Sequence, residues 1–174
     1  MTVMTRTVSA DRRPRILVAA SAVLAGALAF AAPAAAQYRV EIPNNIAACQ
    51  AGSGPAVLVT ISGVKSSSGR IRVQSYRATP SEWLEKGRWL NRVEIPARAG
   101  TMTVCMPVPA AGSYGIAVRH DVNGNGSTDL RTDGGGMSNN PSINIFNLGR
   151  PGYRSTAFNV GNDVRSIAIA MKYW

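Results

Sequence analysis

The chain has 174 residues, and 19 Lys and Arg against 9 Asp and Glu give it a formal net charge of +10. It contains a single histidine, which excludes a zinc site built on two or three histidines. The basic residues occur as singles and pairs without a long run, so specific nucleic-acid binding is not expected. An anionic component of the cell envelope remains open as a partner.

Residues 1–36 have the order of an export signal. Four arginines precede an uncharged run at 16–30, and small residues follow up to Ala34-Ala35-Ala36. This order predicts a signal peptide that is cleaved after Ala36 and a periplasmic or secreted protein. An uncleaved anchor is the alternative, but a proline interrupts the apolar stretch and a membrane span needs about 20 apolar residues. We therefore expect no transmembrane span after processing.

The processed chain would begin at Gln37 and have 174 − 36 = 138 residues, a length that suits one domain. Loss of four basic residues and one acidic residue leaves a formal charge of 10 − 4 + 1 = +7. Residues 37–55 show little periodicity and are expected to form a lead-in segment. We expect the domain itself at 56–174.

The two cysteines, Cys49 and Cys105, both follow the predicted signal. Oxidising conditions outside the cytoplasm favour a disulfide between them, and two free thiols are the alternative. Closing a loop of this length would stabilise the fold by about 4 kcal/mol in the chain-entropy model.

Alternation of apolar and polar residues predicts about seven short strands with turns between most of them. This pattern is typical of an all-β fold, and we expect an antiparallel β-sandwich. The strands are expected at 57–61, 71–74, 90–95, 101–106, 114–120, 157–160 and 166–173.

One short helix is expected after Thr79. Thr79 would be the N-cap, Pro80 the first helical residue, Glu82 the end of a capping box, and Gly87 the stop. Trp83 would pack this helix onto a sheet as a lid. A second departure from the strand pattern is the long Gly- and Asn-rich loop at 121–154, and loops of this length are usually functional or held by a ligand.

The start of this loop has the spacing of a calcium-binding loop. Oxygen-bearing side chains stand at positions 1, 3, 5 and 9, the residue at position 7 can offer its backbone carbonyl, and a glycine at position 6 permits a sharp bend. These candidate metal ligands are Asp121, Asn123, Asn125, Ser127 and Asp129.

Two features weaken the calcium hypothesis. Position 12, which is a bidentate glutamate in an EF-hand, is Thr132 here, although the adjacent Asp133 could replace it. The pairs Asn123-Gly124 and Asn125-Gly126 also form good turns without a metal. Calcium and plain turns therefore both remain open, and any calcium site should be weak, with a dissociation constant of about 10⁻⁴ to 10⁻³ M.

His120 is expected to be a hydrogen-bonded structural residue, because it ends a strand whose apolar side chains share its face. A hydrolase using His120 is an alternative that the sequence does not favour. Neighbouring residues of a strand point to opposite faces, so His120 and Asp121 cannot easily form an aligned acid–base pair.

Several segments together resemble a family of secreted bacterial proteins, domain of unknown function 2141. They are the run from Gly112 to Gly126 (GSYGIAVRHDVNGNG), the later Gly136-Met-Ser-Asn-Asn, and the alternating end with Tyr173. The resemblance covers about residues 55–173 and implies an exported β-sandwich without an established activity. Residues 130–135 depart from the family, which usually has a Gly-Ile-Pro-type stretch with a glutamate before the Gly-x-Ser-Asn-Asn element.

These observations predict an exported, non-enzymatic β-sandwich module that binds a partner or has a structural role, with a weak calcium-stabilised loop. A protein that binds an anionic polymer or the envelope surface is the main alternative, because the processed chain is still basic. The sequence does not identify the partner.

Overall fold

Two β-sheets build the part of the chain that the computed structural model describes, residues 37–144, 147 and 149–173. These residues belong to one compact unit. The signal peptide predicted at 1–36 lies outside the described residues.

The larger sheet has seven strands in the order β1-β4-β3-β6-β7-β10, and β8 pairs with β6 beside this path. β8 meets the first residues of β6, whereas β7 meets its last residues. The strands are β1 (Val40–Glu41), β3 (Arg70–Arg77), β4 (Asn91–Pro96), β6 (Gly112–Asp121), β7 (Gly134–Met137), β8 (Phe158–Val160) and β10 (Lys172–Tyr173).

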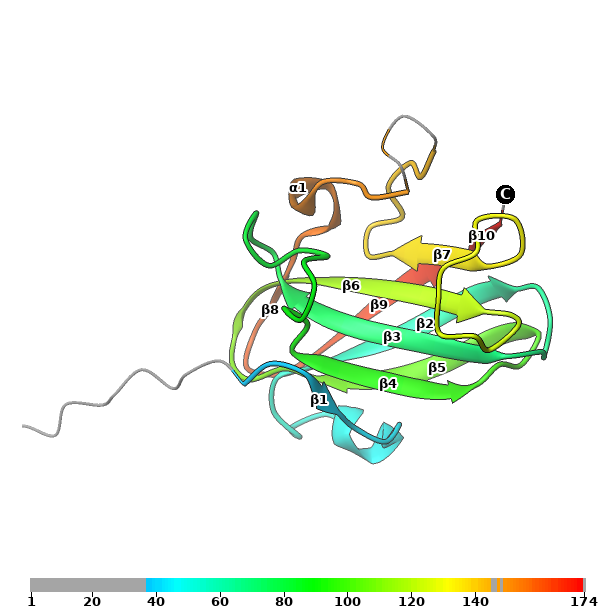
Figure 1. The fold of residues 1–174 in the computed structure, drawn as a ribbon. Helices are drawn as coiled ribbons and strands as arrows, with labels where there is room; N and C mark the ends of the chain where they lie inside the picture. The colour runs from blue at the N-terminus through cyan, green and yellow to red at the C-terminus, as the bar shows by residue number, and fades with distance from the viewer. Residues whose placement is uncertain (1–36, 145–146, 148, 174) are drawn as a thin grey trace, which may run out of the picture. The chain divides into compact units, whose positions relative to one another are not determined.

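The smaller sheet has three strands in the order β5-β2-β9. They are β2 (Ala56–Val64), β5 (Gly100–Pro107) and β9 (Val164–Ala170). Side chains from both sheets form one hydrophobic core, with Val57, Val59 and Ile61 of β2 facing residues such as Ile71 and Val73 of β3. The two sheets therefore form a sandwich, as predicted, and its layers are visible in Figure 1.

The sandwich is mixed, so the prediction of purely antiparallel sheets was wrong in this respect. β2 pairs with β9 in parallel, and so do β1 and β4. Parallel pairing needs a long connection between the strands. The chain leaves β2, completes most of the larger sheet and returns only at Val164. Side-chain alternation reveals which face of a strand is buried but carries no information about the direction of its neighbours.

Residues 79–87 form consecutive turns, not the predicted helix. The carboxylate of Glu82 accepts a hydrogen bond from the Tyr38 hydroxyl at 2.8 Å and does not close a capping box. Leu84 has a left-handed φ of 56°, which a continuing helix does not allow. The helical segments of the described chain lie elsewhere, in η1 (Ile46–Cys49) and α1 (Tyr153–Thr156).

The predicted lid residue Trp83 does pack on the outer face of the larger sheet. Its ring meets Tyr76 edge to face at a centroid distance of 5.4 Å and forms a small cluster with Trp89 and Met137. A Cβ at Gly115 of β6 would lie 2.5 Å from the Trp83 ring, so only glycine lets the ring rest on the strand.

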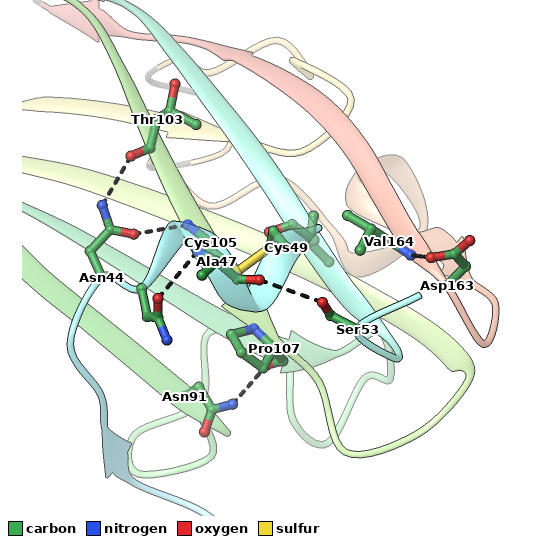
Figure 2. The surroundings of a disulfide bond; sticks show 12 residues. Asn44, Ala47, Cys49, Ser53, Asn91, Thr103, Cys105, Pro107, Asp163 and Val164 are labelled. Carbon is green, nitrogen blue, oxygen red and sulfur yellow. Dashed lines mark hydrogen bonds between the residues drawn. A yellow bond between two sulfur atoms is a disulfide. The ribbon is translucent and has the colours of Figure 1, made fainter. Parts of the chain in front are cut away.

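The lead-in segment is held against the outer face of the smaller sheet by the predicted disulfide. Cys49 of η1 and Cys105 of β5 are bonded, with a Cα–Cα distance of 5.7 Å. Asn44 fixes the same segment, because its amide accepts from the Cys105 N–H and donates to the Thr103 carbonyl, both at 3.0 Å. Figure 2 shows these bonds along the free edge of β5.

The predicted loop at 121–154 is regular in part. β7 adds to the larger sheet and α1 begins near its end, so the irregular stretch that follows β6 is about a dozen residues long, from Val122 to Asp133. Apolar alternation missed β7 because three of its four residues are glycine. No helix of the described residues is long and apolar enough to cross a membrane.

Candidate functional site

The candidate site begins at the end of β6, where the strand leaves the sheet. His120 points into the core, while Arg119 and Asp121 point to the outer face because neighbouring strand residues alternate. The two faces of β6 therefore carry different networks.

His120 is fully buried, and both ring nitrogens have partners. Nε2 lies 2.8 Å from the Ser68 carbonyl oxygen and must donate to it, so Nδ1 accepts from the Tyr173 hydroxyl at 2.7 Å. That hydroxyl accepts in turn from the Lys65 N–H at 3.0 Å. Burial raises the pKa of Tyr173. The network ties the end of β6 to β10 and to the turn before β3.

Three of the predicted metal ligands come together through side-chain turns. The Oδ1 atoms of Asn123 and Asn125 accept from the backbone N–H two residues later, at 3.1 and 2.8 Å. Both amide groups donate to Oδ2 of Asp129, at 2.9 and 2.8 Å. The asparagines therefore form the turns expected of Asn-Gly pairs, with their oxygens bonded to the loop backbone and their amide nitrogens to Asp129.

Asp121, at position 1 of the motif, is the buried member of the set. Its Oδ2 accepts from the N–H of Gly126, at position 6, at 2.8 Å and lies 3.3 Å from Nη2 of Arg119. Its Oδ1 is buried and has no hydrogen-bond partner among the residues that the structure describes. A buried carboxylate oxygen without a partner costs about 1–3 kcal/mol. This atom is thus an unsatisfied acceptor at the base of the loop.

Asp133 holds the two ends of the loop together. It is buried, its Oδ1 accepts from the Val122 N–H at 3.0 Å, and its Oδ2 accepts from the Asp129 N–H at 2.9 Å. Both oxygens are thereby engaged with the backbone at the two ends of the loop. If Asp133 replaced the calcium ligand at position 12, at least one of its oxygens would have to bind the ion as well as a backbone N–H.

Arg119 supplies a positive charge to the same loop. Its guanidinium donates to Thr128 Oγ1 at 3.0 Å and to the Gly126 carbonyl at 2.9 Å, in addition to Asp121. Burial, together with the charge of Arg72, lowers the pKa of Arg119, while the carboxylates of Asp121 and Asp133 oppose the shift. Arg119 was not among the residues predicted to form the site. The signal available in the sequence is its place two residues before Asp121, on the same face of the strand.

Within the described ranges, no three His, Cys, Asp or Glu side chains are grouped so that they could hold a metal ion. The oxygens around the loop come instead from a mixture of carboxylate, amide and backbone carbonyl groups. Calcium accepts such mixed oxygen ligands, whereas zinc favours nitrogen and sulfur. If the site binds a metal, calcium is the metal that fits it.

The Gly-x-Ser-Asn-Asn element lies beyond the loop and joins separate strands. Ser138 is fully buried, accepts from the Ile116 N–H at 3.1 Å and donates to the Thr156 carbonyl at 2.6 Å. Asn140 accepts from the Ala170 N–H at 2.7 Å and donates to the Ala168 carbonyl at 3.0 Å. Asn140 thus bonds to a backbone N–H and a backbone carbonyl of β9, as Asn44 does on β5. Both edges of the smaller sheet are therefore capped by an asparagine amide.

These features define a disulfide-linked β-sandwich domain with a loop built from asparagine turns. The chain belongs to the bacterial family described as "Uncharacterized protein conserved in bacteria (DUF2141)", whose model matches residues 59–168. The resemblance noted in the sequence is thereby confirmed. No curated protein and no solved structure matches the chain.

Proposed function

We propose that the chain is an exported, non-enzymatic β-sandwich module that acts by binding, in the periplasm or outside the cell, and that its loop at 121–129 holds a calcium ion weakly. The disulfide supports export, because such bonds persist in oxidising compartments. Intact-mass measurement of the exported protein tests this part. A mass that begins at Gln37 is expected, and a retained Met1 would contradict export.

The observation that carries the calcium proposal is the buried, unpartnered Oδ1 of Asp121. It lies in a loop where Oδ2 of the same carboxylate binds the N–H of Gly126, while Asn123 and Asn125 turn their Oδ1 atoms toward the loop backbone. A cation at the base of the loop would satisfy the unpartnered oxygen. Plain asparagine–glycine turns would not require a buried carboxylate at position 1.

The site should be weak for two reasons. Few carboxylates face the loop, and calcium affinity rises with the charge of its ligands. In addition, the guanidinium of Arg119 already lies against Oδ2 of Asp121 and the Gly126 carbonyl, so it competes with the ion. We expect a dissociation constant of about 10⁻³ M.

The geometry around His120 supports a non-enzymatic role. The ring is fully buried and both nitrogens are occupied, so a substrate cannot reach it without displacing Tyr173 or the turn at Ser68. Asp121 lies on the opposite face of β6 and pairs with Arg119. A hydrolase built on these residues would need the sandwich to open.

Thermal unfolding in calcium tests the site. Protein is first stripped with chelator and then melted with and without 10 mM CaCl₂, which should add about 1.4 kcal/mol at a dissociation constant of 10⁻³ M. This gain corresponds to a rise in Tm of about 4–7 °C for a domain of this size. MgCl₂ at the same concentration controls for ionic strength and should do less, because magnesium demands a tight octahedron.

Three variants locate the effect. Asp121→Ala and Asp129→Asn should abolish the calcium-dependent rise, and the second keeps the fold because Oδ1 of an asparagine can still accept from the two loop amides. Asp163→Asn removes an exposed carboxylate elsewhere and should leave the rise unchanged. A Tm that does not respond to calcium in the unmodified protein would refute the site.

A further inference from the structure

A groove of about 380 Å³ lies beside the loop, on the outer face of the larger sheet. β3, β6 and β7 form its floor. Residues of the loop form one wall, including Thr128 and Leu130, and Leu84 with Arg150 form the other. This volume is within the range of sites that hold small molecules, which is about 300–1,000 Å³.

The groove exists because two floor positions carry almost no side chain. Ala117 of β6 and Gly135 of β7 point to the outer face, next to the longer side chains of Met137 and Arg119 with which they pair in the sheet register. Larger residues at these positions would fill the space. The small side chains therefore leave the hollow open between its two walls.

Positive side chains reach the groove from the floor and from one wall. Arg72 and Arg119 stand directly opposite each other on β3 and β6, a like-charge arrangement that destabilises a sheet unless something compensates it. Each has one carboxylate partner: Glu94 lies 2.7 Å from Arg72, and Asp121 lies 3.3 Å from Arg119. Arg150, which is more than half exposed, adds a third cation.

The arginine charges around the groove are offset by nearby carboxylates. Arg72 pairs with Glu94, Arg119 with Asp121, and Arg150 with Glu85, which lies outside the groove at 3.6 Å from Arg150. Asp133 also lines the groove. A calcium ion in the loop would bring two positive charges to the loop wall. Asp129 adds another carboxylate to the loop, so the ion would make the balance of charge beside the three guanidinium groups less negative.

We propose that this groove binds a small organic anion with an apolar body, and that calcium in the 121–129 loop strengthens the binding; the calcium dependence rests on the proposed function. The charged group is attracted by Arg150, whose exposed ion pair with Glu85 at 3.6 Å is weak. The apolar body lies against Met137 and Leu84, beside Leu130, whose side chain is 60% exposed at the rim.

Two fluorescent probes of similar shape test the proposal. 1-Anilinonaphthalene-8-sulfonate carries a sulfonate on an aromatic body, and N-phenyl-1-naphthylamine is its uncharged counterpart. Each is titrated into folded protein with 10 mM CaCl₂, with 10 mM MgCl₂, and with chelator. Calcium should tighten binding of the sulfonate about three- to fivefold, which is the attraction expected between a divalent ion and an anion about 10 Å apart in water. The uncharged probe should show no such change.

Exposed residues supply variants that keep the fold. Arg150→Gln should weaken the sulfonate about threefold or more and the uncharged probe less, because it removes the charge together with the hydrogen bond from Arg150 to the Leu84 carbonyl. Leu130→Ser should weaken both probes, because it removes apolar surface at the rim. Arg165→Gln makes the same charge change on β9 of the other sheet and is the matched control, with wild-type binding expected.

The outcomes separate the two proposals. If calcium raises the Tm, but neither calcium nor Arg150→Gln changes the affinity for the sulfonate, the groove proposal is overturned and the calcium site stands. Equal binding of the charged and uncharged probes overturns it as well. If calcium leaves the Tm unchanged while the sulfonate still binds and Arg150→Gln weakens it, the groove is an anion site and its calcium dependence is refuted.

Discussion

Replacement of Asn140 should open the edge of β9 and destabilise the sandwich. The Asn140 amide accepts from the Ala170 N–H at 2.7 Å and donates to the Ala168 carbonyl at 3.0 Å, so it takes the place of a neighbouring strand. Its backbone has a left-handed φ of 49°, which asparagine and aspartate tolerate better than alanine. Both the hydrogen bonds and the conformation depend on this residue.

Two variants separate these contributions. Asn140→Asp keeps the acceptor and the tolerance of a left-handed φ but loses the bond to Ala168, so it should cost about 1 kcal/mol. Asn140→Ala loses both bonds, at about 0.5–1.5 kcal/mol each, and adds about 1 kcal/mol for the left-handed backbone. The alanine variant should therefore lose about 2–4 kcal/mol in total.

Urea unfolding with linear extrapolation measures both costs, and size-exclusion chromatography with light scattering reports any pairing of opened edges. Asn162→Ala, at an exposed bend between β8 and β9, is the matched control and should stay near the wild-type free energy of unfolding. An Asn140→Ala variant within 0.5 kcal/mol of wild type, as an order of magnitude for surface substitutions, would show that water satisfies the β9 edge equally well.

Three other predictions concern the rest of the fold. Asn44→Ala should lower the free energy of unfolding by about 1–2 kcal/mol in the same assay, because it removes the equivalent bonds on β5. Reduction of the Cys49–Cys105 bond, which spans a sequence separation of 56, should cost about 4 kcal/mol, and unfolding curves unaffected by reductant would contradict this. Burial raises the pKa of Tyr173 above its ordinary value of 10.0, so its contribution to stability is complete below pH 10.0 and is lost as the pH rises through the folded pKa. Tyr173→Phe should flatten this alkaline fall, and an unchanged slope in melting curves recorded against pH would refute the assignment.

The alternating strands were predictable because burial on one face leaves a regular trace in the sequence. Val57, Val59 and Ile61 are fully buried, as their spacing indicates. The direction of β9 was not predictable, because pairing partners are chosen by the whole topology. β7 was missed for a local reason: its glycines lie under Tyr173 and Ile169, where a side chain has no room, so the strand lacks the apolar residues that reveal the others.

The prediction of a helix after Thr79 was wrong because a tertiary contact of Glu82 outweighed the local capping pattern. Glu82 was expected to bond to the backbone of its own turn, but Tyr38 of the lead-in segment takes its carboxylate. The contacts within the loop at 121–129 are, by contrast, almost entirely local. Asn123, Asn125 and Asp129 come together through bonds that span six residues or fewer, so their spacing in the sequence was sufficient to bring them to one place.

The residues that mark the family can be divided by what they bond. Ser138 and Asn140 bond to backbone groups of other strands, and His120 bonds to the Ser68 carbonyl and to Tyr173, so the fold itself accounts for them. Asp121 is different, because its Oδ1 is buried and has no partner within the described chain. Its Oδ2 accepts a hydrogen bond from Arg119. An unsatisfied buried carboxylate oxygen lowers the stability of the fold. Because Arg119 also lines the adjacent groove, an ion that takes over Asp121 would change the charge available there, and this link between loop and groove is where we expect the binding function to lie.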